Sequence, residues 1–512
     1  MVPTASGART SCSLDVAAQA ETADFLRRLS RRDPVETHIS LVFVGEDTVW
    51  KLKKAVKLPF LDFTDPETRH RLTQRELELN TPAAPGLYRD VAAIVRKPDG
   101  SLALGRPDSP GAIDWVLRMA RIPEQDLLDV RARGGPLEPS LLDQLADAVA
   151  AYHARAPIAD IDPVADMRSI IEGNLRAAAA AGLSAETTAE WGRQVITILE
   201  ACAARLHVRA GAGFVRRGHG DLHLGNICIW DGRPVPFDAL EFDEALATID
   251  VAYDLAFLLM DLDVRVGRAA ANRVMNRYIG RTGDAGLTAL LPLFLSVRAM
   301  VLAHIRRVRG DPAKAAGYLQ AALGYLTCSV PVALAIGGLQ GSGKSTLARA
   351  LAPELSRAPG ALILRSDEIR KRRNGVAPED RLPKSAYTEA ESRAVFAELA
   401  NELEQAAAGG HSVIADATFI DPVHRRMVSA AAGRAGVPFR GLWLEAPLDV
   451  LASRIANRQT DASDATIAVL RAAAKSKTIP PHDWTRIDAT DFASALAAAR
   501  QAVLEMQTRP AN

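Results

Sequence analysis

Two stretches of this chain place residue types at spacings that suit phosphate chemistry. The first is residues 338–345, where every fixed position of the pattern G-x-x-x-x-G-K-[ST] is filled. Gly341 and Gly343 let the backbone turn its N–H groups towards phosphate oxygens, and the helix that follows adds favourable partial charge. Lys344 is expected to bridge the β- and γ-phosphates, and Ser345 to supply a hydroxyl ligand to Mg²⁺. The pattern predicts that this stretch binds ATP or GTP. The residues predicted to contact the nucleotide are Gly338, Gly341, Ser342, Gly343, Lys344, Ser345 and Thr346.

Two carboxylates end later apolar strands of the same region. Asp367 follows the expected strand 361–365, at the carboxyl edge of a parallel sheet, where catalytic groups gather. Its carboxylate is suited to accept the proton of an acceptor hydroxyl. Asp416 ends the expected strand 412–415 and is predicted to hold Mg²⁺ through water or to bind substrate. A helix cap before Phe419 is the alternative role for Asp416.

Arg454 and Arg458 lie four residues apart in an expected helix, so both project from one face. Such a pair is suited to clamp transferring phosphates, and two solvated surface arginines are the alternative. The segment 448–464 resembles the mobile lid of the nucleoside-monophosphate-kinase-like P-loop kinases, the group that includes gluconate kinase and polynucleotide kinase. The resemblance implies that the lid arginines close over ATP. It spans about residues 330–499 and rests on Arg365-Ser366-Asp367, Asp416-Ala417-Thr418 and Asp461-Ala462-Ser463-Asp464-Ala465.

The second stretch is residues 219–226, which read His-Gly-Asp-Leu-His-Leu-Gly-Asn. Asp221 and Asn226 have the D-x-x-x-x-N spacing of the protein-kinase catalytic loop. With that spacing, Asp221 is expected to orient and deprotonate an acceptor hydroxyl, and Asn226 to reach a Mg²⁺ ion on the nucleotide phosphates. A second metal carboxylate is then required. Asp238, at the end of a short hairpin, is the better placed candidate, and Asp243 is the other.

The second stretch resembles the aminoglycoside phosphotransferase and choline kinase families, whose pattern is H-G-D-x-x-x-x-N, then an apolar-Asp pair, then D-L-A. The last element here is Asp254-Leu255-Ala256. The resemblance covers roughly residues 35–325. Asp238 is not followed by the glycine of a D-F-G element, and this half has no kinase Gly-rich loop with three glycines; phosphotransferases of this family commonly lack both. A pseudokinase is the alternative.

The same resemblance implies roles for residues nearer the N-terminus. Lys51 is expected to contact the α- and β-phosphates, with Glu76 as its helix partner. Lys53 lies on the same strand face and is able to take the place of Lys51. Backbone groups near Met119 are expected to hold the adenine ring.

The apolar pattern predicts the elements that must position these residues. Alternation over residues 39–52 predicts a hairpin that turns at Gly45-Glu46-Asp47, and strands are expected at 91–95 and 114–119. Helical periodicity covers residues 125–206 and 249–325. From residue 331 onwards apolar strands alternate with helical segments, which indicates βαβ units and a parallel sheet. The five expected strands are 332–336, 361–365, 412–415, 440–444 and 484–487.

The predicted fold class is therefore mixed α/β and α+β. An N-terminal extension over residues 1–34, helical or partly disordered, precedes a bilobal protein-kinase-like domain over residues 35–328. A P-loop domain with a five-stranded parallel sheet follows at residues 329–512.

Composition favours a globular protein that works on small molecules. The chain is 48% hydrophobic and 24% charged, and its formal net charge is +1, so a large nucleic-acid or membrane surface is not expected. Without a long apolar run, we predict no membrane partner and a cytoplasmic location. The basic cluster Lys371-Arg372-Arg373 is interpreted as a solvated face. The four cysteines form no Cys-x-x-Cys pair and are expected to be buried free thiols. His219 and His223 are expected to order their loop, because no third ligand stands at metal spacing.

These inferences predict a bifunctional phosphotransferase in which each half uses ATP and Mg²⁺ to phosphorylate small-molecule hydroxyls. Two alternatives remain. The N-terminal half is a silent ligand-binding module that regulates an active P-loop kinase, or the whole chain is an ATP-driven switch that phosphorylates nothing. The sequence does not identify either acceptor or the oligomeric state.

Overall fold

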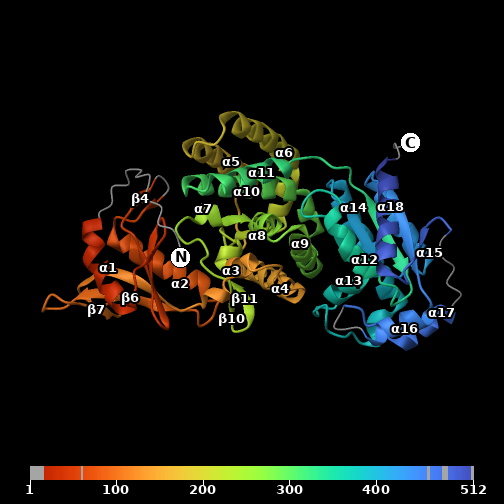
Figure 1. Ribbon diagram of the computed structural model, residues 1–512, viewed down its shortest axis with the longest axis horizontal. Helices are drawn as coiled ribbons and strands as arrows, with labels where there is room; N and C mark the ends of the chain where they lie inside the picture. The colour runs from red at the N-terminus through yellow and green to blue at the C-terminus, as the bar shows by residue number, and fades with distance from the viewer. Residues whose placement is uncertain (1–15, 59–60, 458–461, 476–481, 509–512) are drawn as a thin grey trace. The chain divides into compact units, whose positions relative to one another are not determined.

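The computed structural model describes residues 16–58, 61–457, 462–475 and 482–508 (Figure 1). The chain divides into two compact units. The first is Met1–Gly134 together with Arg217–Ile249, and the second is Gly135–Arg216 together with Asp250–Asn512. The domain boundaries drawn from the sequence stay predictions.

A six-stranded antiparallel sheet forms the centre of the first unit, in the order β1-β2-β3-β8-β6-β7. The predicted hairpin is confirmed by β2 and β3, which pair on either side of a turn at Gly45. A side chain at Gly45 would collide with Trp50. The strands expected at 91–95 and 114–119 lie inside β6 and β8. The bounds are β1 (Val35–Glu36), β2 (Ser40–Val44), β3 (Thr48–Lys53), β6 (Tyr88–Arg96), β7 (Leu102–Gly105) and β8 (Ala112–Ala120).

Two helices cover this sheet. Leu26 of α1 (Val16–Ser30) packs in an apolar cluster with Phe43 and Leu52 of the sheet. Helix α2 (Pro66–Asn80) begins after Asp65, whose carboxylate accepts a hydrogen bond from Thr68 N at 2.8 Å. Its buried face carries Glu76. The unit also contains β4 (Lys57–Leu58), β5 (Leu61–Asp62), η1 (Glu124–Asp126), α3 (Leu128–Arg133), η2 (Leu224–Asn226), β10 (Ile227–Trp230), β11 (Arg233–Pro236) and α7 (Glu244–Ala247).

The second unit begins with helices. The helical periodicity predicted for residues 125–206 and 249–325 is confirmed by α3 to α6 and by α8 to α11. All residues from Val251 to Leu262 of α8 are buried, among them the carboxylates of Asp254 and Asp261. The bounds are α4 (Pro139–Arg155), α5 (Pro163–Ala180), α6 (Ala185–Gly211), α8 (Val251–Arg265), α9 (Arg268–Thr282), η3 (Ala285–Ala289), α10 (Leu291–Val308) and α11 (Pro312–Gly324). The short strands β9 (Val215–Arg217) and β12 (Thr248–Asp250) lie where the chain passes between units.

A five-stranded, fully parallel sheet completes the second unit, in the order β14-β15-β13-β16-β17. The predicted fold class is thereby confirmed. Leu347 and Leu351 of α12 and Ala499 and Val503 of α18 pack in one apolar core with the sheet. The strands are β13 (Ala333–Gly338), β14 (Leu362–Arg365), β15 (Val413–Asp416), β16 (Phe439–Glu445) and β17 (Thr485–Asp488). The helices are α12 (Lys344–Leu351), η4 (Ala352–Glu354), α13 (Ser366–Arg373), η5 (Lys384–Tyr387), α14 (Glu389–Ala408), α15 (Pro422–Arg434), α16 (Leu448–Ala456), α17 (Ile467–Lys475) and α18 (Phe492–Thr508).

This strand order brings three carboxyl ends together. Asp416 at the end of β15 pairs in register with Ile336 of β13 and with Arg365 of β14. The loop after β13 and the first turn after β14 therefore flank Asp416, which is the arrangement that the sequence predicted.

Two smaller expectations also have an outcome. Cys202 and Cys228 are buried free thiols, as predicted, whereas Cys328 is exposed, so the prediction of burial is wrong there. Cys12 lies outside the described residues. Among the described helices, none is both long and apolar enough to cross a membrane.

Candidate functional site

The loop between β13 and α12 forms a phosphate cradle. Gly341 and Gly343 have positive φ angles of 83° and 90°, a conformation that favours glycine. A Cβ on Gly338 would lie 2.5 Å from the carbonyl oxygen of Leu444, so no side chain fits there. Lys344 Nζ donates to the carbonyl oxygens of Gly338 at 3.1 Å and Leu339 at 2.9 Å. The lysine is thus folded over its own loop, where phosphates would lie.

The cradle contains a buried polar group that suits a phosphate ligand. Ser342 is 1% exposed, and its hydroxyl has no hydrogen-bond partner. Leaving such a group unsatisfied costs about 1–3 kcal/mol. A phosphate oxygen, which accepts hydrogen bonds, would relieve that cost, so the residues present fit a nucleotide phosphate.

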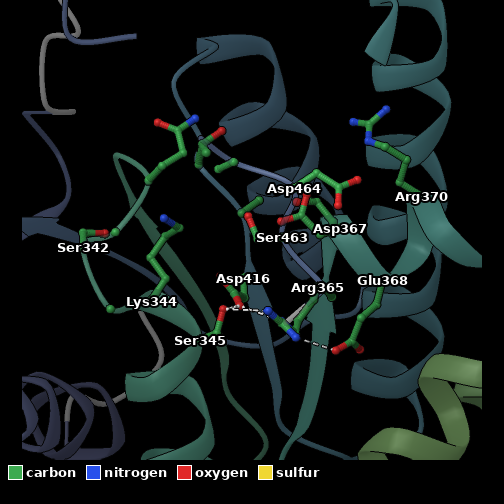
Figure 2. A pocket seen from close by; sticks show the side chains of 18 of the residues that line it. Ser342, Lys344, Ser345, Arg365, Asp367, Glu368, Arg370, Asp416, Ser463 and Asp464 are labelled. Atoms are coloured by element: carbon green, nitrogen blue, oxygen red, sulfur yellow. Dashed lines mark hydrogen bonds and ion pairs between the residues drawn. The ribbon is translucent and has the colours of Figure 1, made fainter. Parts of the chain in front are cut away.

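Ser345 and Asp416 stand side by side at the foot of the cradle (Figure 2). Ser345 Oγ donates to Asp416 Oδ2 at 2.5 Å, and the guanidinium of Arg365 donates to both groups, at 3.1 Å and 3.2 Å. A hydroxyl and a carboxylate are oxygen ligands that suit Mg²⁺. The helix-cap alternative for Asp416 does not describe this geometry, because Asp421 caps α15.

Metal held there would depend on the nucleotide. The described residues include no cluster of three or more histidine, cysteine or acidic side chains that could hold an ion by themselves. Mg²⁺ is commonly bound through one or two protein groups plus substrate phosphates. Ser345 and Asp416 would fill that protein share.

Asp367 lies in the first turn of α13 and lines the same cavity as Lys344 and Ser345. Burial raises the pKa of Asp367; Arg365 opposes this shift, and the nearby Asp416 carboxylate adds to it. A hydrogen bond with Ser463 also holds the carboxylate. In Figure 2, Asp367 lies between Lys344 on one side and Arg370 on the other.

Arg370 is a buried cation on the far side of this cavity. It is 6% exposed, donates to Ala386 O at 2.7 Å and Ser392 Oγ at 3.3 Å, and stacks on Tyr387. It forms no ion pair with any described carboxylate, and its Nε has no partner. Glu391 forms its ion pair with Arg373, at 2.8 Å, and this contact lowers the pKa of Glu391; the charge of Arg370 helps to lower that pKa further. The cavity, of about 1360 Å³, is thus lined by a buried guanidinium that forms no ion pair with any described carboxylate.

Asp464 orders the loop that follows α13, on the same side of the cavity as Arg370. It accepts hydrogen bonds from Lys371 Nζ at 3.0 Å, Leu382 N at 3.0 Å and Tyr387 OH at 2.6 Å. Lys371 is only 1% exposed, and Arg372 pairs with Glu398 at 2.7 Å. The prediction that Lys371-Arg372-Arg373 is a solvated face is therefore wrong for its first two members, because the helix turns them onto acidic partners far along the chain.

Thr346 and Arg454, which the sequence predicts to contact the nucleotide, line the cavity. Arg454 Nη2 donates to Thr490 O at 2.9 Å. Arg458 lies outside the described residues, so the proposed arginine pair cannot be described.

A second charged cluster occupies the first unit. Lys51 Nζ on β3 pairs with Glu76 Oε1 at 2.7 Å and with Asp238 Oδ1 at 2.5 Å. Burial alone would lower the pKa of Lys51, but the carboxylates of Asp238 and Glu76 raise it well above its ordinary value. Burial alone would likewise raise the pKa of Glu76, yet Lys51 and Lys53 lower it to about 2. The structure thus brings the predicted lysine, its helix partner and the second metal carboxylate together.

Lys53 points to the same cluster but has another partner. Its ammonium pairs with Glu76 at 2.7 Å and also with Glu241, and it is almost fully buried. Lys51, whose side chain is 13% exposed, is the lysine that remains accessible.

The predicted catalytic loop is ordered by its own side chains. Asn226 Nδ2 donates to both the carbonyl and the Oδ2 of Asp221 at 2.9 Å. His219 Nδ1 accepts from Asp221 N at 3.3 Å, and His223 Nδ1 accepts from Gly225 N at 2.9 Å. The histidines order the loop, as expected.

Asp238 and Asp243 differ in their roles. Asp238 has a positive φ of 63°, an uncommon conformation for this residue type that is often kept at functional sites. Its amide donates to Tyr88 OH at 2.9 Å, and its side chain is 40% exposed. Asp243 instead caps α7. Of the two carboxylates, the geometry therefore favours Asp238 as the candidate metal ligand.

Met119 lies within β8, where its buried position pairs with Val49 of β3 and Tyr88 of β6. Asp254 is fully buried in α8 of the second unit, where its carboxylate lies 3.3 Å from His153 Nε2.

Sequence reasoning missed Arg365, Arg370, Glu241 and Asp464 as members of these sites. Arg365 and Arg370 flank Asp367 by two and three residues, so their nearness to it was the available signal. Glu241 carries no comparable pattern, because its partner Lys53 is 188 positions away.

Known protein families match the two halves of the chain separately. Residues 101–291 match the model of the phosphotransferase enzyme family, and residues 334–480 match that of an AAA domain. An uncharacterized protein of Mycobacterium tuberculosis is 31% identical over 473 residues, which cover 88% of this chain and 90% of that protein. These matches confirm the predicted resemblance of both halves.

Two solved structures each resemble one part of the chain. A choline/ethanolamine kinase family protein from Mesorhizobium loti shares 13% identity with a TM-score of 0.38, covering 60% of this chain and 95% of its own. A gluconokinase from Sinorhizobium meliloti shares 21% identity with a TM-score of 0.26, covering 35% of this chain and 98% of its own.

Proposed function

We propose that this chain, which belongs to one family with the uncharacterized Mycobacterium tuberculosis protein, is a bifunctional ATP-dependent phosphotransferase. Each half would transfer the γ-phosphate of ATP to a hydroxyl group of a small molecule. The observation that carries the proposal is the position of Asp367, a shielded carboxylate in the same cavity as Lys344 and Ser345. A cradle with no such base would suit a motor or switch ATPase equally well.

At the P-loop site, Asp367 would accept the proton of the acceptor hydroxyl while that oxygen bonds to the γ-phosphorus. The bond from this phosphorus to the β–γ bridging oxygen then breaks, leaving ADP. Lys344 and Arg454 would offset the negative charge on the phosphoryl oxygens. Mg²⁺, held by Ser345 and Asp416, would shield phosphate charge when bound. The raised pKa of Asp367 brings it closer to that of a working general base.

Arg370 favours an acidic acceptor at this site. A buried guanidinium without a carboxylate partner is costly, and a carboxylate or phosphate on the acceptor would neutralise it. Exposed Arg381 and Lys384 also line the cavity and add positive charge at its edge. A polyhydroxy acid or a phosphorylated polyol fits this pattern better than a neutral or cationic compound.

At the kinase-like site, Asp221 would be the base, and the Lys51–Glu76 pair would hold the α- and β-phosphates. Asn226 and Asp238 would hold Mg²⁺. The Lys51–Glu76 ion pair supports activity at this site, because that pairing accompanies a competent kinase arrangement. The silent-module and switch alternatives are the outcomes that the following experiment separates.

The test measures ATP-dependent phosphate transfer by the full chain to neutral polyols and to their carboxylated and phosphorylated forms. We expect Lys344→Ala to leave residual transfer and Lys344→Ala with Asp221→Asn to abolish it. Asp367→Asn should lower transfer at the P-loop site about 10²- to 10⁴-fold, the usual share of a general base.

Two results would contradict parts of this proposal. If Asp221→Asn changes no rate, the kinase-like half is a silent module. If the wild type hydrolyses ATP without labelling any acceptor, and Asp367→Asn hydrolyses it equally fast, the chain is a switch.

A further inference from the structure

Helix α9 lies within the segment that matches the phosphotransferase enzyme family, yet its side chains contact the P-loop sheet. Asn276 Oδ1 accepts from Ile363 N at 2.6 Å, and its Nδ2 donates to Ala361 O at 3.2 Å. Asn272 Nδ2 donates to the same carbonyl at 3.0 Å. Since β14 is an edge strand, the amide of Asn276 takes the hydrogen-bonding place of a neighbouring strand.

The same helix also holds the two segments that follow β14. Arg372 of α13 donates to the carbonyl oxygens of Ile279 at 3.5 Å and Gly280 at 3.2 Å, near the end of α9. Arg277 of α9 pairs with Glu379, in the loop after α13, at 2.7 Å. Arg277 is held in turn by Asp147 of α4 at 2.6 Å.

Helix α9 is itself firmly fixed. Tyr278 and Ile279 are almost fully buried. Tyr278 OH lies 2.9 Å from His153 Nδ1, and the other nitrogen of that ring contacts Asp254. A helix anchored in this way can act as a rigid support for what it touches.

The contacts of α9 bracket Asp367. Strand β14 precedes this residue, α13 carries it, and the loop of Glu379 follows it. We propose that α9 belongs to the P-loop site. In this proposal Asn276 and Arg277 are positioning residues, which hold β14 and the loop after α13 and thereby fix the position of Asp367 between them. The expected loss of catalysis rests on the proposed phosphotransfer at that site. The expected loosening of the segment around Asp367 does not.

The test compares Asn276→Leu in the full chain with Asn174→Leu as a matched control. Asn174 is buried, whereas Asn276 is partly buried, and Asn174 makes two hydrogen bonds, to Ile170 O and His304 Nε2, both at 3.0 Å and both away from the P-loop segment. Hydrogen–deuterium exchange is measured for residues 362–373 and, as a reference, for β13 and α12.

We expect Asn276→Leu to speed exchange over residues 362–373 about tenfold, the effect of losing hydrogen bonds of ordinary strength. Exchange in β13 and α12 and the affinity for a non-hydrolysable ATP analogue should stay within twofold of wild type. Phosphate transfer at the P-loop site should fall about tenfold in kcat. Asn174→Leu should change none of these.

A second variant keeps the test decisive if Asn276→Leu does not fold. Glu379→Gln alters an exposed side chain and removes only its ion pair with Arg277. It should speed exchange over residues 374–383 alone. Exchange unchanged in both variants, or raised equally across β13 and α12, would overturn the inference. A wild type that phosphorylates no acceptor would defeat the proposed function, while the exchange measurement would still decide the role of α9.

Discussion

Glu402, on α14, is a buried carboxylate whose charge the protein tolerates poorly. Burial raises its pKa from 4.5 to about 7; the ion pair with Arg372 opposes this shift, and the nearby Glu398 adds to it. Because the folded state holds the proton more tightly than the unfolded state, this group stabilises the fold most below pH 4.5. That contribution is lost as the pH rises through about 7.

We therefore predict that Glu402→Gln removes part of the pH dependence of stability. In the wild type, this group should make the free energy of unfolding at pH 8 lower than at pH 4.5 by at most about 3 kcal/mol, since one pKa unit corresponds to 1.36 kcal/mol. Urea unfolding at several pH values measures the difference. Glu404→Gln is the control, because Glu404 lies on the same helix but pairs with Arg434 at the surface. Identical pH dependence in wild type and Glu402→Gln would refute this account.

At the scale of elements, strands that are buried on both faces were the easiest to predict. All five strands of the parallel sheet lie within two residues of their expected bounds. Strands β13, β14 and β15 are mainly apolar runs that are buried throughout, whereas β17, with the sequence Thr-Arg-Ile-Asp, is partly exposed. The short strands β1, β4, β5 and β7 were not predicted. At two residues each, β1, β4 and β5 are too short to show any alternation.

The partners of the site residues were harder to predict than the residues themselves. Ser345 and Asp367 follow from local spacing, since a loop or a strand end fixes where they lie. The contact of Asn276 with β14 joins positions 87 residues apart, and an asparagine in a helix carries no signal of it. The misreading of Lys371 has the same cause: its partner Asp464 is 93 residues away.

Asp464 is one of the carboxylates that hold the loop between α13 and α14. Asp464 accepts hydrogen bonds from Lys371 before the loop, from Leu382 within it and from Tyr387 at its end. Asp464 is 15% exposed, so its ionic bond to nearly buried Lys371 is only weakly screened. One side chain thus ties down a segment that lines the cavity.

We predict that Asp464→Asn loosens this loop. The amide keeps one acceptor oxygen but loses the charge that offsets Lys371, which leaves a buried cation unpaired. Trypsin should then cleave after exposed Arg381 and Lys384 at least about tenfold faster than in the wild type, because cleavage follows local opening. Mass spectrometry of the fragments over time measures the rates. Asp449→Asn, an exposed change on α16, is the control; equal cleavage in all three proteins would show that Asp464 is not the tether.

The whole molecule joins two phosphate sites of different construction. The P-loop site would surround phosphates with backbone N–H groups and one lysine from the same short loop. The kinase-like site brings Lys51, Glu76 and Asp238 from three separate elements into one network of ion pairs. We therefore expect a single substitution to disable one site and to leave the other untouched.

This independence leads to a prediction about nucleotide stoichiometry. With Mg²⁺ and a non-hydrolysable ATP analogue, calorimetry of the full chain should show two binding events per chain. Lys51→Met should remove the event at the kinase-like site and Lys344→Ala the event at the P-loop, each weakening its own site about 100-fold through loss of a charged hydrogen bond. Lys57→Met is the control, because Lys57 is an exposed lysine that pairs with Asp62 at 2.7 Å. A single event in the wild type that Lys344→Ala abolishes would mean that the kinase-like half binds no nucleotide, and its charged network would then serve the fold alone.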